Sequence, residues 1–266
     1  MGFLNHRNRD NEPEDERFLR GGGVLAVWGS PGSGKTTVSV KLAEHLTKKG
    51  NNVLLVFNDM ITPPIPYVMA PSDLMGEKSL GSILAASRIT EDLIKRNCVF
   101  YRRNKYLSIV GMQKGENVYT YPPFDERLAT EFLFAAEEVA PFVIIDCTSD
   151  LTSDLLSKAA LMNADYVLRL VNCDLKSISY LSSQLPLLVD EKWDVEKQVK
   201  VASNVKPNEG AGSMESVLGK VSYRIPHCAE VEGQFLEGEL IHELNLKGSR
   251  PFRAEIERIS KEVFGI

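Results

Sequence analysis

The sequence predicts a single α/β domain in which helices cover both faces of a mostly parallel, twisted sheet. Strand-like and helix-like segments alternate from about residue 21 onward, which is typical of a doubly wound domain. The strand candidates are apolar over their whole length, as expected of strands buried on both faces. The composition, 43% hydrophobic and 25% charged, is that of a globular protein. We expect residues 21–266 to form this domain and the polar residues 1–20 to form a flexible arm.

The individual elements follow from periodicity. Strands are expected at 24–28, 53–57, 107–110, 143–146, 167–171 and 199–204. Helices are expected at 35–49, 80–95 with a break, 125–139, 153–162, 178–189, 213–218 and 253–263. Residues 60–73 are rich in proline and lack periodicity, so they should form a loop after the second strand. Ligands bind beyond the carboxyl ends of strands in such sheets, so this loop is placed to cover or sense one.

Composition excludes several classes of protein. The longest apolar runs, such as residues 24–28, are far too short for a membrane span, and the N-terminus lacks the apolar stretch of a signal peptide. The four cysteines are widely spaced and form no C-x-x-C motif, which predicts reduced thiols in the cytoplasm and neither disulfides nor a zinc site. The net charge of −5 is unfavourable for sequence-blind DNA binding.

The strongest motif is the segment Gly29–Thr37, which fits the pattern G-x-x-x-x-G-K-[ST] between an apolar strand and an amphipathic helix. Its glycines allow backbone N–H groups to surround phosphate oxygens, and the helix N-terminus adds a positive dipole end. Lys35 would neutralise the terminal phosphates, and the hydroxyl of Thr36 would bind Mg²⁺. The sequence therefore predicts a nucleotide site formed by Gly29, Gly32, Ser33, Gly34, Lys35, Thr36 and Thr37.

Two acidic residues follow predicted strands and complete this site. Asp146 ends an apolar strand, the form of an acid that orients the Mg²⁺ shell, although a strand-terminal Asp can also cap the next helix. Asp59 follows the second strand, where it could orient the attacking water or accept its proton; the alternative is a turn-forming residue beside Asn58. We expect Asp150 to be a helix cap and Cys147 a buried apolar residue.

An ordered set of segments resembles the ParA/MinD family of P-loop ATPases. The set comprises residues 23–59, 141–150, 163–185, 199–210 and 225–244, so the resemblance covers roughly residues 22–264. It implies that Lys35, Asp59 and Asp146 are catalytic and that Thr36 and Asp146 hold Mg²⁺. It also implies that Asn204 recognises adenine and that Pro226 and His227 pack against the base. From the residues alone, Asn204 could equally be a turn residue, and a surface or capping role is favoured for His227.

The sequence departs from the family pattern at two places. Most members carry a second lysine directly after the first glycine of the phosphate loop, which crosses to the nucleotide of a dimer partner, but this chain has Ser30 there. Where the family often has two acids, Phe57-Asn58-Asp59 retains one. Because a cation opposite the phosphates stabilises developing charge, its loss predicts slow hydrolysis. Some members of the branch associated with Tad pili are similar in lacking this lysine.

These observations predict an Mg-ATP-binding, slowly hydrolysing positional or assembly switch for DNA partition or for a pilus or secretion machine. Expected partners are ATP, a second copy of the chain as a homodimer and a protein of unknown identity. DNA binding is not favoured, because acidic residues such as Glu230 adjoin the basic ones, and direct membrane insertion is not expected. One alternative is an ATP-bound scaffold or constitutive dimer without useful turnover. The other is a small-molecule P-loop kinase, which the absence of Arg and Lys from residues 61–73 disfavours.

Overall fold

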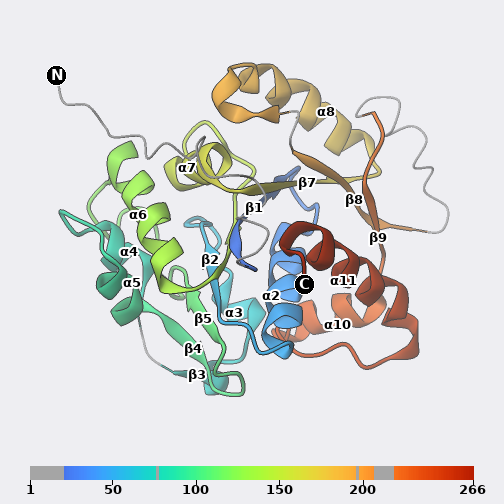
Figure 1. Ribbon diagram of the computed structural model, residues 1–266, viewed down its shortest axis with the longest axis horizontal. Helices are drawn as coiled ribbons and strands as arrows, with labels where there is room; N and C mark the ends of the chain where they lie inside the picture. Colours follow the sequence, from blue (N-terminus) through green and yellow to red (C-terminus); the bar gives the residue numbers. More distant parts are fainter. Residues whose placement is uncertain (1–20, 76–77, 196–197, 207–218) are drawn as a thin grey trace.

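The structure is a computed structural model and describes residues 21–75, 78–195, 198–206 and 219–266. Within these residues, nine strands form one sheet in the order β3-β4-β5-β2-β6-β1-β7-β8-β9 (Figure 1). The strands are β1 (Gly23–Gly29), β2 (Val53–Phe57), β3 (Leu74–Met75), β4 (Val99–Tyr101), β5 (Leu107–Val110), β6 (Phe142–Asp146), β7 (Tyr166–Asn172), β8 (Val199–Val205) and β9 (Tyr223–Pro226). The pairs from β5 to β9 are parallel, and β3, β4 and β5 pair antiparallel. The predicted mostly parallel sheet is confirmed.

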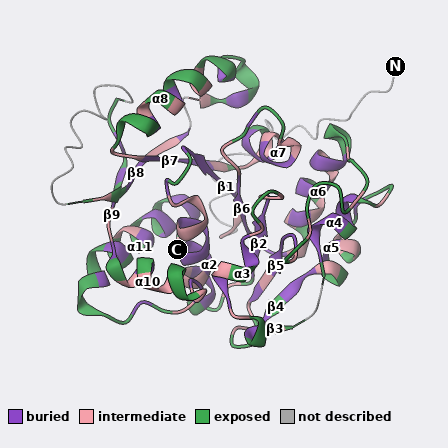
Figure 2. Ribbon diagram, turned by 180° about the vertical axis from the view of Figure 1, so that it is seen from behind, coloured by how far each residue is buried: buried purple, intermediate pink, exposed green. Residues whose placement is uncertain are grey.

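Helices cover both faces of the sheet, as predicted. They are α2 (Lys35–Lys48), α3 (Ile65–Val68), α4 (Leu80–Leu84), α5 (Glu91–Asn97), α6 (Glu126–Val139), α7 (Leu155–Asn163), α8 (Leu175–Gln184), α10 (Ala229–Glu237) and α11 (Arg250–Phe264). The buried side chains form two clusters. One holds residues of α4, α5, α6, α7 and α8, and the other holds residues of α2, α3, α10 and α11. Figure 2 shows the buried strands between these two layers.

Strand β1 shows why the central strands are apolar throughout. Ala26 and Trp28 belong to the first cluster, whereas Leu25 and Val27 belong to the second. Successive side chains of a strand point to opposite faces, so a strand with helices on both sides needs apolar residues at every position. The central strands are therefore buried on both faces, and the predicted site residues lie at the carboxyl edge of this packed sheet.

The helix starts are set by side-chain caps. Asp125 accepts a hydrogen bond from Leu128 N at the start of α6, and Asp174 accepts one from Ser177 N at the start of α8. Helix α8 therefore begins before the predicted residue 178, and it ends at Gln184, just before Pro186, rather than at residue 189. Helix α7 begins at Leu155, because Asp154 is its cap and not Asp150.

Several short elements were not predicted from periodicity. They are β3, β4, β9, α3 and α10, of which α3 lies inside the segment 60–73 that was expected to be a loop. The predicted break in 80–95 is present, since α4 ends at Leu84 and Thr90 caps α5. The predicted arm 1–20 and the predicted helix 213–218 lie outside the described residues.

Candidate functional site

The predicted phosphate loop connects the end of β1 to the start of α2. Gly29 is required by a close approach: a Cβ atom there would lie 1.9 Å from the carbonyl oxygen of Leu170 in β7. Gly32 and Gly34 have φ values of 74° and 79°, which glycine adopts without strain. Asn172, at the end of β7, donates its side-chain Nδ2 to Gly32 O at 3.0 Å. The loop is thus fixed from the neighbouring strand.

The N-terminus of α2 is suited to bind an anion. Its cap residue is Gly34, so no side chain accepts a hydrogen bond from the first-turn N–H groups. The positive end of the helix dipole lies at the same place. Thr36 and Thr37, in this first turn, line a pocket of about 470 Å³ together with Gly32, Gly34 and Lys35. Ser33 is buried beside them. The backbone there presents the donors that phosphate groups need.

Lys35 turns back over the loop. Its Nζ donates to Ser149 Oγ at 2.6 Å and to Ser30 O at 3.2 Å. Burial lowers the pKa of Lys35, and the nearby Asp146 carboxylate opposes that shift. Ser149 Oγ in turn donates to Gly29 O at 2.7 Å. The cation is therefore held at the phosphate loop by groups that phosphate oxygens can replace.

Asp146 and Thr36 meet beneath the loop. The Thr36 hydroxyl donates to Asp146 Oδ2 at 2.6 Å, while Asp146 Oδ1 is buried and has no hydrogen-bond partner among the described residues. Burial raises the pKa of Asp146 to about 7, against the opposing effects of Thr36 and Lys35. A hydroxyl and a carboxylate with an unpartnered oxygen fit Mg²⁺, which prefers oxygen ligands and takes its remaining ligands from water and phosphate.

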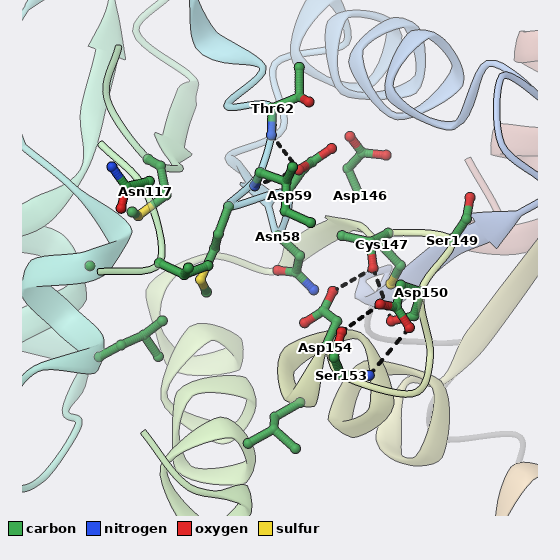
Figure 3. A pocket seen from close by; sticks show the side chains of 18 of the residues that line it. Asn58, Asp59, Thr62, Asn117, Asp146, Cys147, Ser149, Asp150, Ser153 and Asp154 are labelled. Atoms are coloured by element: carbon green, nitrogen blue, oxygen red, sulfur yellow. Dashed lines mark hydrogen bonds between the residues drawn. The ribbon is translucent and has the colours of Figure 1, made fainter. Parts of the chain in front are cut away.

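Asp59 lies in the same cavity as Asp146, after the adjacent strand β2 (Figure 3). Its Oδ1 accepts hydrogen bonds from the N–H groups of Ile61 at 2.9 Å and Thr62 at 2.7 Å. Asp59 thus has the turn-forming contacts of the alternative interpretation. Its Oδ2 has no hydrogen bond to a described residue, so one oxygen remains for a water molecule.

The pocket that begins at the phosphate loop ends at the carboxyl edges of β8 and β9. Asn204, Pro226 and His227 line this end. Asn204 has a φ of 53°, and its Oδ1 lies 2.9 Å from His227 Nδ1. The residues alone favour a surface or capping role for His227, whereas the family resemblance implies that it packs against the base; in the structure His227 lines this pocket beside Asn204. One elongated pocket therefore joins the phosphate loop to these predicted base-contacting residues.

Ser30 is fully buried, and its hydroxyl donates to Ser177 Oγ of α8 at 2.9 Å. A second bond links α8 to the loop after Asp146, since Tyr180 OH donates to Ser149 O at 2.6 Å. The side chain at position 30 points into the domain, away from any surface a partner could reach.

The acids of the loop after β6 form local turns. Asp150 accepts hydrogen bonds from the hydroxyls of Ser153 and Thr152, which lower its pKa to about 2. Asp150 is therefore a turn residue and not the predicted helix cap. Cys147 is buried, and burial raises its thiol pKa, as expected for an apolar role.

Four residues near the site were not predicted: Tyr67, Ser149, Asn172 and Tyr180. Asn172 ends β7, so the rule that ligands bind beyond strand ends could have identified it. Tyr67 belongs to α3 and lines the pocket beside Thr36; burial raises its pKa to about 12. Tyr180 carries no sequence signal, because its contact depends on how α8 packs.

The fold and the site together define a P-loop nucleotide-binding protein. The family model described as AAA domain matches residues 29–200, and the chain belongs to that family. No curated protein matches the sequence.

Solved structures share the fold. A ParA family ATPase from Chlorobium tepidum TLS is 14% identical, with a TM-score of 0.72 over 90% of this chain and 98% of that one. The septum site-determining protein MinD from Pyrococcus horikoshii OT3, complexed with Mg-ADP, is 16% identical, with a TM-score of 0.67 over 90% and 95%. A MinC:MinD cell division protein complex from Aquifex aeolicus is 17% identical, with a TM-score of 0.68 over 91% and 96%. The resemblance to ParA/MinD ATPases is thus confirmed for the fold.

Within the described parts of the chain, no helix has the length and apolar character needed to cross a membrane.

Proposed function

We propose that this protein binds Mg-ATP, hydrolyses it slowly and acts as a positional or assembly switch. The observation that carries the proposal is the single pocket that runs from the phosphate loop to the Asn204–His227 pair. A nucleotide in this orientation has its base at the ends of β8 and β9 and its phosphates at α2. The solved MinD complex with Mg-ADP, similar in fold, supports this choice of ligand.

The roles of the phosphate-end residues follow from their contacts. The phosphate oxygens replace Ser149 as the acceptor for Lys35, whose buried cation then balances their charge. Thr36 Oγ1 and Asp146 would hold Mg²⁺, which when bound neutralises charge on the phosphates. Asp59 Oδ2 orients the attacking water, while the bonds of Oδ1 to Ile61 N and Thr62 N fix the carboxylate. Asn204 accepts a hydrogen bond from the adenine amino group.

Slow turnover and self-association are parts of the same proposal. The buried Ser30 leaves no lysine at this position to reach a partner's nucleotide. Charge developing in the transition state then lacks one stabilising cation. We propose that a second copy of the chain, as a homodimer, and a further protein partner read the nucleotide state through the loops after Asp59 and Asp146. The MinC:MinD complex, a structural neighbour, supports the expectation of a protein partner.

The second candidate is an ATP-bound scaffold without useful turnover, which the inward-facing Ser30 favours. Light scattering separates the candidates. The molar mass of Asp59→Ala is measured with no nucleotide, with ADP, and with ATP plus Mg²⁺. A dimer that forms only with ATP supports the switch, whereas an unchanged mass in all three conditions supports the scaffold. Lys35→Ala, which should not bind ATP, is the control.

A further inference from the structure

A second cavity begins where the proposed nucleotide pocket ends. It has a volume of about 570 Å³, within the usual range for small organic ligands, and it shares only Gly32, Lys35 and Thr36 with the nucleotide pocket. Asp59 and Asp146 line it as well. In the proposed complex the terminal phosphate, Mg²⁺ and the attacking water take the end of this cavity that Lys35, Thr36, Asp59 and Asp146 line. The part of the cavity beyond them then stays open to a second ligand.

The far side of the cavity is apolar. Leu84, Met112, Phe124 and Leu155 line it, together with prolines of the segment before α6. Leu84 and Met112 are buried in the core, which fixes their positions. Moving an aromatic or aliphatic group from water into this apolar part of the cavity is favourable.

The wall formed by Tyr121 is held in place by contacts on two sides. A Cβ atom on Gly81 would lie 2.0 Å from the Tyr121 ring, so glycine lets the ring lie directly against α4. Tyr121 OH donates to Glu116 Oε1 at 2.6 Å. Glu116 Oε2 also accepts from Gln113 N at 2.7 Å and from Ser79 Oγ at 2.5 Å. The cavity is therefore preformed.

The end of the cavity near the phosphate loop offers acceptors. Asn58 lines it, is 1% exposed, and its Oδ1 has no hydrogen-bond partner among the described residues. Asp59 and Asp150 line the same end (Figure 3). Lys35 is the one cationic side chain among the described lining residues, and in the proposed complex it faces phosphate. A buried acceptor without a partner is costly, so a ligand that donates a hydrogen bond there is favoured and an anion is disfavoured.

We propose that this cavity is a second ligand site, which takes a small molecule with an apolar body and an amine or alcohol group that donates to Asn58 Oδ1. The inference rests on the proposed nucleotide site, because the bound phosphate removes the effect of the Lys35 charge. A bound nucleotide should therefore strengthen the binding of an amine.

Three indoles that share one apolar body test the proposal: tryptamine, tryptophol and indole-3-acetate. Each is titrated by calorimetry into the full chain saturated with Mg²⁺ and a non-hydrolysable ATP analogue. The amine and the alcohol should bind at least about tenfold more tightly than the carboxylate, a difference of about 1.4 kcal/mol. The proposal is wrong if the carboxylate binds as tightly, or if none of the three binds.

Two variants locate the site. Asn58→Leu, similar in size, removes the acceptor and should weaken tryptamine binding by about tenfold. Ile61→Ser changes a lining residue that is 82% exposed, so it should fold and still weaken all three indoles. Leu236→Ser, at a residue that is 78% exposed and outside the cavity, is the matched control. Unchanged binding in both lining variants would overturn the assignment.

Titration of the ATP analogue alone separates this inference from the proposed function. If the analogue binds and the indoles do not, only the second site is wrong. If the analogue does not bind, the nucleotide proposal itself fails. Without nucleotide, tryptamine should bind more weakly, because no phosphate then neutralises the Lys35 charge that repels it; equal binding in both states would overturn the coupling.

Discussion

The hydroxyls of Ser30 and Ser177 form a buried hydrogen bond of 2.9 Å that ties the phosphate loop to the start of α8. Position 30 is thus a packing position in this chain. Two consequences can be measured, one for stability and one for turnover.

Ser30→Lys should destabilise the protein and should not accelerate hydrolysis. The new ammonium group would be buried beside Ser177 without a counter-ion, which costs roughly 3–5 kcal/mol. Ser30→Ala, the control, loses one hydrogen bond and about 1 kcal/mol. Urea unfolding measures both, and phosphate release measures turnover. Faster hydrolysis by a stable Ser30→Lys protein would show that the side chain can reach a partner's nucleotide.

Gly29→Ala should be far more disruptive than Gly32→Ala. At Gly29 a Cβ atom would clash with Leu170 O, whereas nothing lies within 4 Å of a Cβ atom at Gly32. The second change costs only the strain of a positive φ, about 1 kcal/mol. The first requires β1 and β7 to separate, so we expect a loss of about 3 kcal/mol or more. Thermal unfolding gives the comparison, and equal losses would contradict it.

Stability should depend on pH through Lys41, a buried residue of α2. Its Nζ donates to Gln234 Oε1 at 2.6 Å and to His242 O at 2.5 Å. Burial lowers the pKa of Lys41 to about 8, although nearby carboxylates oppose the shift. Because the unfolded chain binds this proton up to about pH 10.5, the folded state loses it first.

The buried Lys41 charge therefore makes its full destabilising contribution below about pH 8, and this contribution disappears as the pH rises to about 10.5. Relative to Lys41→Met, the wild-type chain should gain about 3 kcal/mol of unfolding free energy over that interval. Urea titrations of both proteins at pH 7.5 and 10 measure most of this difference. A constant difference between the two proteins would show that Lys41 keeps its ordinary pKa.

Asn204→Gly should weaken ATP binding about tenfold while leaving the fold intact. Glycine accepts the φ of 53° but removes the amide that faces His227 and the proposed base. Asp194→Gly is the matched control, since Asp194 is the other described non-glycine residue with a positive φ and does not line the pocket. Fluorescence titration with ATP and GTP measures the effect. An equal loss for both nucleotides would show that Asn204 does not distinguish their bases.

The parts of the molecule that the sequence predicts best are those with strong local signals. Apolar strands such as β2 are found at the predicted residues, and the phosphate-loop motif lies between β1 and α2. Short elements such as β9 and α10 carry too few periodic residues to stand out. The boundaries of α7 and α8 depend on which of several nearby acids is the cap, a choice that tertiary contacts make.

The candidate site divides in the same way. Lys35, Thr36 and Asp146 belong to recognisable motifs, and the structure brings them together. No local sequence pattern identifies Ser149 and Tyr180, because the hydrogen bond between them joins segments 31 residues apart and depends on how α8 packs. His227 looks like a surface residue until the strands place it beside Asn204.

Helix α8 holds two loops at once, through Ser177 to Ser30 and through Tyr180 to Ser149. A molecule that binds α8 and favours one position of the helix would therefore change the free energy of nucleotide binding to those loops. Thermodynamic reciprocity makes the effect mutual: the nucleotide must change the affinity of that molecule by the same factor. Measuring either affinity with and without the other ligand would thus give the coupling free energy for both.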